Sequence, residues 1–270
     1  MLKKYKKISK SIRRTILDTI YIAKHGHIGG SFSCIDILIA LYFGKFLKYN
    51  PKKPNLKDRD RFILSKGHAT AGFFSLLAHL GYISFTELKT YCRNNSRLGS
   101  HPSHLIPGVE HDTGSLGHGL GIACGIAYSA KLDSKKYKTY VLISDGELYE
   151  GSTWEALLFA NHYNLNNLII IIDRNSQIVM DHTEDCMKLN PLEKKIKSFG
   201  FMTKTINGHS YNELIKTFKK INTIKLSKPF VLIANTVKGK GVSFMEKNVK
   251  WHHAVPVENE YKLAIEELKK

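Results

Sequence analysis

Two oxygen-bearing side chains follow two apolar segments near the middle of the sequence. Asp145 comes soon after the β-branched run 140–143, and Asn175 follows the isoleucine-rich run 168–172. Carboxylate and amide oxygens are hard ligands that suit an octahedral divalent cation, which a phosphate group can also ligate. Either residue alone is more often a turn, cap or loop residue. The pairing is what predicts a magnesium ion with a diphosphate.

The elements that would position this pair form one βαβ unit. Both apolar runs are short and are closed at once by turn residues, which favours buried parallel strands. Between them, Ser152 and Glu155 have the spacing of a capping box and predict a helix that begins near Thr153. A right-handed crossover makes the strands parallel, so Asp145 and Asn175 would emerge at the same carboxyl edge, where open α/β sheets bind ligands.

Length and composition permit a large folded core. The chain has 270 residues, of which 43% are hydrophobic, so one large α/β domain is as plausible as two small ones. No apolar run approaches the roughly 20 residues that cross a bilayer, and the basic amino terminus lacks the apolar segment of a signal peptide. We therefore expect a cytoplasmic protein without a membrane anchor. Its cysteines have no metal-ligand spacing and are expected to be reduced and buried; they are Cys34, Cys92, Cys124 and Cys186.

The net charge of +18 raises the question of nucleic acid. The lysines are spread from end to end and accompany many Ile and Asn residues, which favours a bias in nucleotide composition over a binding function. Part of the charge is also suited to anionic sugar phosphates or an acidic partner. The Lys/Gly tract 236–241 lacks the order of a phosphate-binding loop, which excludes a nucleotide triphosphatase.

Histidines occur in two glycine-containing stretches next to predicted helices, the loop 25–31 and the pair Gly67-His68. A helix predicted over 9–24 ends in the glycine-rich loop 25–31, whose backbone can approach a ligand closely, and Ser33 is expected to cap the next helix. His68 follows Gly67 at the start of another predicted helix, where N–H groups suit a diphosphate. A lone histidine in a loop is more often a surface residue than a catalyst, so these positions need support from wider patterns.

The remaining segments predict supporting elements. Apolar runs that end at Leu64 and Ala234 read as further buried strands, and residues 211–221 as a surface helix. His209, in the turn before that helix, is expected to be structural. The Glu/Lys-rich segment 257–270 predicts a solvated closing helix.

The central pair resembles the thiamine diphosphate signature, in which Gly-Asp-Gly is followed about one βαβ unit later by Asn. Ser144 replaces the first glycine, and the second half reads Asp-Arg-Asn, with Arg174 where an acidic or amide residue is more usual. The resemblance implies that Asp145, Asn175 and the backbone carbonyl of Gln177 hold Mg²⁺.

Other stretches resemble the transketolase family in particular. The loop 25–31 is similar to Gly-His-Pro-Gly-Gly-Ser, with Ile28 in place of proline. The segment 59–68 matches Asp-Arg-Phe, a strand and Ser-x-Gly-His, and the segment 107–119 matches Pro-Gly-Val-Glu and Thr-Gly-x-Leu-Gly-x-Gly. His118 stands where full-length transketolases usually carry Gln.

The resemblance runs from about Arg14 to His253. It implies a doubly wound parallel sheet with helices on both faces, forming a single thiamine diphosphate-binding domain over residues 1–270. The implied cofactor contacts are His68, Gly114, Ser115, Leu116, Asp145, Gly146 and Asn175. The residues implied beside the reacting sugar are His27, His101 and His252.

The implied reaction transfers a two-carbon ketol unit from a ketose phosphate to an aldose. The family's second domain supplies a glutamate for the aminopyrimidine, and the resemblance implies that a second polypeptide would have to supply it here. We therefore hypothesise an amino-terminal subunit of a split transketolase, which acts with a carboxy-terminal, pyrimidine-domain subunit in a dimer of heterodimers. Glu150 is expected at a subunit contact.

Several alternatives stay open at this point. A deoxyxylulose phosphate synthase or the α subunit of a 2-oxo acid dehydrogenase shares the signature, although 59–68 and the pair Trp251-His252 favour transketolase. A transketolase-like paralogue could act on an unusual sugar in a surface-polysaccharide or secondary pathway. A scaffold that has lost its chemistry and a noncatalytic basic nucleic-acid-binding protein are the alternatives of other classes.

Overall fold

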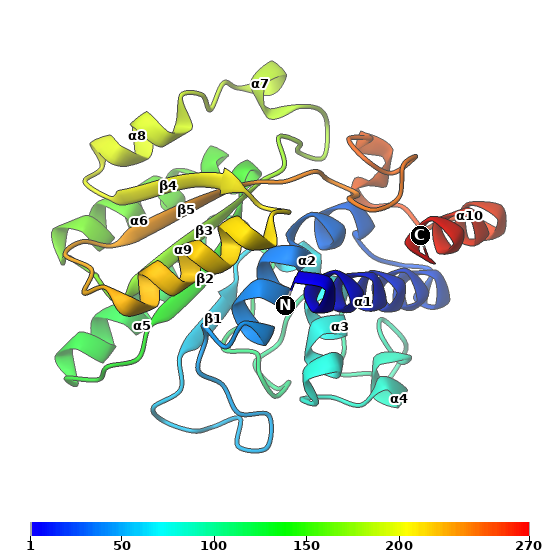
Figure 1. Ribbon diagram of the computed structural model, residues 1–270, viewed down its shortest axis with the longest axis horizontal. Coiled ribbons are helices and arrows are strands. Elements are labelled where there is room, and N and C mark those ends of the chain that lie inside the picture. The colour runs from blue at the N-terminus through cyan, green and yellow to red at the C-terminus, as the bar shows by residue number, and fades with distance from the viewer. Residues whose placement is uncertain (1, 270) are drawn as a thin grey trace.

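The computed structural model describes residues 2–269, and a five-stranded parallel sheet forms its centre (Figure 1). The strands lie in the order β1-β2-β3-β5-β4, and all neighbours are parallel. They are β1 (Arg61–Leu64), β2 (Thr139–Ser144), β3 (Leu168–Arg174), β4 (Met202–Asn207) and β5 (Phe230–Asn235). This confirms the predicted α/β class. Strand β4 was not predicted, because it lies at the edge of the sheet and carries lysine and threonine in place of an apolar run.

Helices cover both faces of the sheet, which confirms the doubly wound arrangement. Alternate residues of one strand point to opposite faces, so Leu142 packs in one apolar core and Val141 in a second. The first core is covered by α1 (Leu2–Ala23), α2 (Ile28–Phe43), α3 (Thr70–Leu80), α9 (Tyr211–Thr223) and α10 (Glu258–Lys269). The second is covered by α5 (Gly119–Leu132), α6 (Gly151–His162) and α8 (Leu192–Ser198). Shorter elements are α4 (Phe85–Leu88), α7 (Thr183–Cys186) and the 3₁₀ turns η1 (Gly67–Ala69), η2 (Asp145–Tyr149) and η3 (Val249–His252).

The central βαβ unit consists of β2, α6 and β3, as predicted. Ser144 pairs with Asp173 in the register of the two strands, so the residues that follow each strand meet at the same edge. The helix begins at Gly151, two residues before the predicted start near Thr153, and the turn η2 precedes it. Ser152 therefore does not cap the helix, and its hydroxyl donates to the carbonyl of Gly117 at 3.0 Å.

Helix α2 begins earlier than predicted. The glycine-rich stretch enters the helix at Ile28, so Ser33 lies inside α2 and is not its cap. Its hydroxyl donates to the Gly30 carbonyl at 3.0 Å and to Asp173 at 2.6 Å. Gly29 is required by packing, because a Cβ there would lie 2.7 Å from the Trp251 carbonyl oxygen. The glycines allow close contact between segments and do not form a flexible loop.

The helices at both ends were predicted, with small differences. The first begins at Leu2, before the expected residue 9, and the closing helix spans Glu258–Lys269. The prediction for the closing helix included Lys270, which lies outside the described residues, as does Met1. All four cysteines are free. The expectation that all are buried is confirmed for Cys34 and Cys124, but Cys92 is partly exposed and Cys186, at the end of α7, is exposed.

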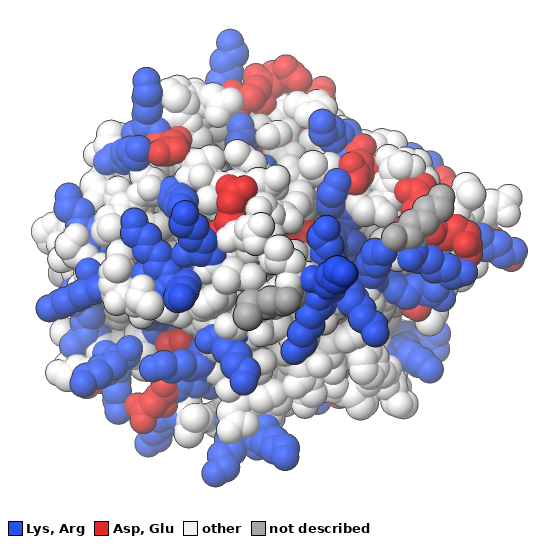
Figure 2. Space-filling view, viewed as in Figure 1, with Lys and Arg blue, Asp and Glu red and all other residues white. Residues whose placement is uncertain are grey.

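The basic charge does not gather in one place on the visible face. Figure 2 shows Lys and Arg side chains over the whole of it, with acidic groups between them. Within residues 2–269, we find no helix with the length and hydropathy that a membrane span requires.

Candidate functional site

The carboxyl ends of β2 and β3 border a cavity of about 380 Å³. Nine predicted site residues line it: His27, His68, His101, Gly114, Leu116, Gly146, Asn175, Gln177 and His252. Asp145 is fully buried beside Gly146, and Ser115 is exposed between the lining residues Gly114 and Leu116. The sequence thus identified residues from several separate segments that the fold brings to one place.

Asp145 is held by bonds from the chain that follows β3. Its Oδ2 accepts from the backbone N–H of Ser176 at 2.6 Å and from Arg174 Nη1 at 3.0 Å, and its Oδ1 accepts from the N–H of Gly146 at 3.0 Å. Burial raises the pKa of the Asp145 carboxyl, and the neighbouring guanidinium opposes that rise. The two ends predicted to meet, after β2 and after β3, are therefore directly bonded.

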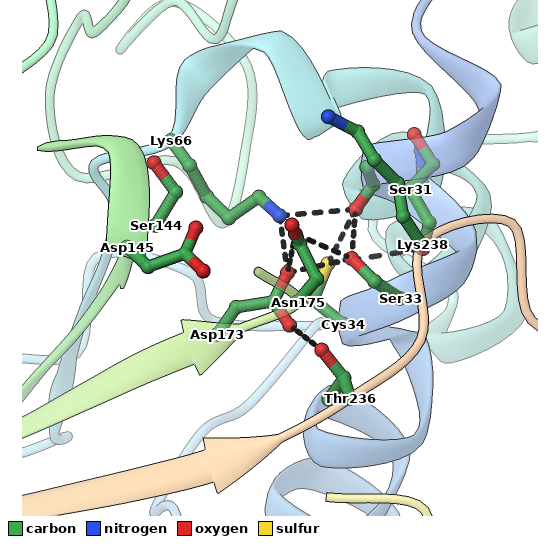
Figure 3. Close-up of polar contacts among 12 residues, drawn as sticks. Ser31, Ser33, Cys34, Lys66, Ser144, Asp145, Asp173, Asn175, Thr236 and Lys238 are labelled. Atoms are coloured by element: carbon green, nitrogen blue, oxygen red, sulfur yellow. Dashed lines mark hydrogen bonds and ion pairs between the residues drawn. The ribbon is translucent and has the colours of Figure 1, made fainter. Parts of the chain in front are cut away.

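The amide of Asn175 is oriented by its neighbours. Its Nδ2 donates to Asp173 Oδ2 at 3.3 Å and to Ser33 Oγ at 3.5 Å, which assigns the other amide atom as oxygen. That oxygen accepts from the backbone N–H of Gln177 at 3.1 Å. Figure 3 shows the Asp145 carboxylate directed toward Asn175. Carboxylate, amide and backbone carbonyl oxygens form a hard donor set, whereas no group of three His, Cys, Asp or Glu side chains in residues 2–269 is arranged to hold a metal.

A buried ion pair lies beneath these oxygens, and the sequence did not reveal it. Lys66 Nζ lies 2.5 Å from Asp173 Oδ2 and donates to the Gly30 carbonyl at 3.1 Å, with both charged side chains fully buried (Figure 3). Thr236 donates to the other Asp173 oxygen. Burial alone would raise the pKa of Asp173, but the Lys66 ammonium lowers it overall. Asp173 thus stays ionised and can hold the Asn175 amide in place.

Lys238 is a second lysine at this cavity, and the prediction missed it as well. Its side chain is 2% exposed, and Nζ donates to the carbonyls of Gln177 and Ile178 at 3.2 Å and to His252 Nδ1 at 2.7 Å. Burial, aided by the charge of Lys66, lowers its pKa to about 8. Lys238 belongs to the Lys/Gly tract 236–241, which does not have the residue order of a triphosphate-binding loop. The tract nevertheless places a cationic side chain at the cavity.

Three histidines form one cluster on the cavity wall. The rings of His27, His68 and His252 lie with centroids 5.5 Å apart in each pair. Burial lowers the pKa of His27 and of His252 to about 3, with further lowering from His253 and Lys238 respectively. Neutral imidazoles can both donate and accept a hydrogen bond. His27 Nδ1 is buried without a partner, as expected of a group whose partner is a ligand.

Comparison with known proteins identifies the family of the chain. Residues 4–269 match the family described as "Transketolase, thiamine diphosphate binding domain". The chain belongs to the transketolase family. It is 42% identical over 260 residues to an apulose-4-phosphate transketolase subunit of Phocaeicola vulgatus, a match that covers 96% of this chain and 92% of the relative. It is 36% identical to a 6-deoxy-6-sulfo-D-fructose transketolase subunit of a Clostridium species, covering 96% and 94%.

Comparison with solved structures shows how much of a full-length transketolase this chain corresponds to. The chain superposes on the transketolase from Leishmania mexicana with a TM-score of 0.93 and 30% identity, covering 98% of this chain and 41% of that one. The resemblance to the thiamine diphosphate-dependent ketol transferases is therefore confirmed for the family and the fold. The chain corresponds to the amino-terminal, diphosphate-binding part of a transketolase.

The glycines of this transketolase domain bring the histidines close to backbone. A Cβ on Gly114 would lie 3.0 Å from the ring of His101, and a Cβ on Gly30 would lie 3.1 Å from the ring of His68. Burial and the charge of His25 lower the pKa of His101. These contacts explain why glycine stands at both positions, since any side chain would displace an imidazole.

The departures from the family pattern have different structural consequences. His118 is exposed, and its ring lies 3.1 Å from the Leu116 carbonyl oxygen. Ile28 is fully buried at the start of α2. Glu150, expected at a subunit contact, lines the cavity. Arg174 bonds the Asp145 carboxylate directly.

Proposed function

We propose that this chain is the diphosphate-binding subunit of a two-subunit transketolase that works with Mg²⁺ and thiamine diphosphate. One observation carries the proposal. Asp145 and Asn175 follow neighbouring strands at the carboxyl edge of the sheet, Asn175 is bonded to the N–H of Gln177, and the Gln177 carbonyl accepts from the buried Lys238, beside a cluster of buried histidines. Oxygen ligands next to a cation suit a metal-bound diphosphate.

The residues fit this cofactor in chemistry as well as in position. Asp145, Asn175 and the Gln177 carbonyl would hold Mg²⁺, and Lys238 would offset the charge of the diphosphate. The unpartnered buried atoms His27 Nδ1 and Gln177 Oε1 support a polar ligand here. Further cofactor contacts would come from His68, Gly114, Ser115, Leu116 and Gly146. When bound, thiamine diphosphate supplies an electron sink for carbon–carbon bond cleavage.

The histidines would serve the sugar. An imidazole that is neutral at pH 7 can accept a proton from a sugar hydroxyl and return it to the acceptor. His27 and His252 line the cavity and would lie beside the donor hydroxyls. Burial lowers their pKa to about 3 in the empty cavity, and the negative charge of a bound diphosphate would raise it toward the range in which an imidazole transfers protons. His101 is exposed at the rim and would bind the donor.

A second subunit would complete the site. The relatives that match this chain nearly end to end are named as subunits. Two apolar side chains beside the cavity, Val179 and Met180, are 59% and 73% exposed and would gain from being covered. We propose a carboxy-terminal, pyrimidine-domain partner in a dimer of heterodimers, with residues 1–270 acting as a single domain. The free cysteines support a reducing, cytoplasmic location.

The substrate would be an anionic ketose. Relatives named for apulose 4-phosphate and for a sulfonated deoxyfructose favour an unusual sugar over the pentose phosphates of the general transketolase reaction. A general transketolase is the second candidate, supported by the likeness to full-length transketolases.

The test is reconstitution. The chain is mixed with its second subunit, Mg²⁺ and thiamine diphosphate, and ketol transfer is followed from a panel of ketose phosphates and sulfonates to an aldose. Transfer is expected from the mixture and to be lost in Asp145→Asn. The control is Asp185→Asn, which changes an exposed carboxylate in α7. Full activity from the chain alone would refute the two-subunit proposal, and activity that survives Asp145→Asn would refute the metal site.

A further inference from the structure

Arg174 connects the proposed metal carboxylate to the segment that follows β3. Its side chain is 6% exposed, and a single nitrogen, Nη1, donates both to Asp145 Oδ2 at 3.0 Å and to Thr183 Oγ1 at 2.6 Å. The other nitrogen, Nη2, donates to Glu184 at 2.6 Å. A guanidinium presents its donors in a rigid fork, so the positions of these three partners depend on one another.

The segment 176–190 is fixed at its base through these bonds. Ser176 and Thr183 close it as a loop, because the N–H of Thr183 donates to the Ser176 carbonyl at 3.0 Å. Glu184 extends the connection, since its carboxylate also accepts from the N–H groups of Leu189 and Asn190 at 3.2 and 3.3 Å. The guanidinium therefore contacts two adjacent residues of the segment, Thr183 and Glu184, and the bonds of these residues reach both ends of it.

The same segment forms one wall of the cofactor cavity. Gln177, Ile178 and Val179 line it, and the Gln177 carbonyl is one of the proposed metal ligands. The N–H of Ser176 donates to the same Asp145 oxygen as Arg174 does. Asp145 Oδ1, by contrast, accepts only the N–H of the adjacent Gly146 among residues 2–269, which leaves it able to ligate a cation.

We propose that Arg174 is a positioning residue that couples metal binding at Asp145 to the order of segment 176–190. The inference rests on the proposed function. A cation on Asp145 Oδ1 fixes the carboxylate, the carboxylate fixes the guanidinium, and the guanidinium holds the loop that carries the Gln177 carbonyl. The coupling runs equally in the opposite direction, because an ordered loop presents its carbonyl and raises the affinity for the metal.

The charge of Arg174 alone predicts the opposite change in Mg²⁺ affinity when this residue is removed. The direction of the change therefore distinguishes the two roles. A guanidinium bonded to a metal ligand repels the incoming cation, so removing it would strengthen Mg²⁺ binding if it had no other role. If Arg174 orders the loop, its removal leaves a smaller binding-competent fraction, and the apparent dissociation constant rises as that fraction falls.

The experiment uses the full chain with Arg174→Gln, reconstituted with its second subunit. Hydrogen exchange of residues 176–190 without cofactor is expected to become about tenfold faster, and Mg²⁺ half-saturation, titrated calorimetrically at saturating thiamine diphosphate, to rise about fivefold or more. Adding Mg²⁺ and thiamine diphosphate should restore most of the protection. The matched control, Lys197→Gln, removes an exposed cation that pairs with Glu193 and should leave both measurements unchanged.

A second variant covers the case in which Arg174→Gln fails to fold. Glu184→Gln removes the second contact with the loop and leaves the Arg174–Asp145 pair in place. Faster exchange of 176–190 is expected here too, with a smaller rise in Mg²⁺ half-saturation. Unchanged exchange in both variants, or tighter Mg²⁺ binding in Arg174→Gln, would overturn the coupling alone. A wild-type complex of the chain with its second subunit that binds no Mg²⁺ with thiamine diphosphate would overturn the proposed function, and the coupling with it.

Discussion

Two buried ion pairs contact helix α2, and they differ in how completely their partners are satisfied. Asp36, in the middle of the helix, accepts from Arg13 at 2.8 and 3.0 Å, from Ser9 at 2.7 Å, and from His209 and Tyr211 at 2.8 Å each. Arg13 also donates to two backbone carbonyls, those of Phe32 and Lys240. This cluster joins α1, α2 and the start of α9, and both of its charged groups are bonded to the protein on every side.

The second pair, Lys66 with Asp173, lies at the carboxyl edge of the sheet and continues into the cavity. Its network includes Asn175, whose amide oxygen is a proposed metal ligand. Around it, His27 Nδ1 and Gln177 Oε1 are buried without partners. Both pairs cost desolvation and both are bonded. What distinguishes a structural cluster from a site is therefore the presence of unsatisfied polar atoms beside it, and not the buried charge itself.

The largest effect on folding is expected from breaking the satisfied pair. Asp36→Asn leaves the Arg13 guanidinium buried without a counter-charge, which should lower the free energy of unfolding by about 3–5 kcal/mol. Urea denaturation of the full chain measures this. Thiamine diphosphate affinity in the presence of Mg²⁺, measured for the folded protein, should stay within about twofold of wild type. A specific loss of cofactor affinity would contradict a purely structural role for this cluster.

The corresponding change in the second pair should affect binding as well as folding. Asp173→Asn leaves Lys66 without a counter-charge and weakens the hold on the Asn175 amide, because Nδ2 donates to Asp173 as well as to Ser33. Substitutions behind a metal ligand typically cost 10–100-fold in affinity, so we expect a loss of about that size in thiamine diphosphate binding with Mg²⁺. Calorimetry of Asp36→Asn and Asp173→Asn side by side provides the control. Equal cofactor affinity in the two variants would remove the distinction between the clusters.

The sequence predicted the parts of the site that follow from local patterns. Asp145 and Asn175 were found because each ends a buried strand, and parallel strands joined by a crossover place such residues at one edge. His27, His68, His101 and His252 were found from a family resemblance, and the fold brings them to one cavity. Their roles there stay predictions.

The missed residues depend on contacts that no local pattern contains. Lys66 and Asp173 lie 107 positions apart, and a lysine next to a predicted helix is normally solvated. Lys238 stood in a tract considered only as a triphosphate loop. Ser33 was assigned to a helix cap because serine favours that position, whereas tertiary packing places it inside α2 beneath the site. Arg174 was noticed as a departure from the signature, but its partners could be seen only in the fold.

The smallest expected effect is a difference between the site histidines and the Asp36 cluster in how the free energy of unfolding depends on pH. His27 and His252 stay neutral when folded, with pKa values lowered to about 3, whereas the unfolded chain protonates them near 6.5. The unfolded state thus binds more protons between these values, so stability falls as pH drops from 6.5 toward 3. Asp36 behaves differently. Burial opposes its ionisation, but Arg13 and His209 lower its pKa overall, so its contribution is retained until the pH falls below about 4.

Replacing one site histidine should therefore flatten the pH profile between about 6.5 and 3 and leave the loss that comes from Asp36 below about pH 4 unchanged. For His27→Gln, the slope of the unfolding free energy between pH 5 and 6.5 should decrease by roughly 0.5–1 kcal/mol per pH unit, less than the full 1.4 because the ring is partly solvated. Urea titrations of the full chain at pH 5, 6 and 7 measure the slope. The control is His162→Gln on exposed α6 surface, and an equal decrease there would show that burial at the cavity is not the cause.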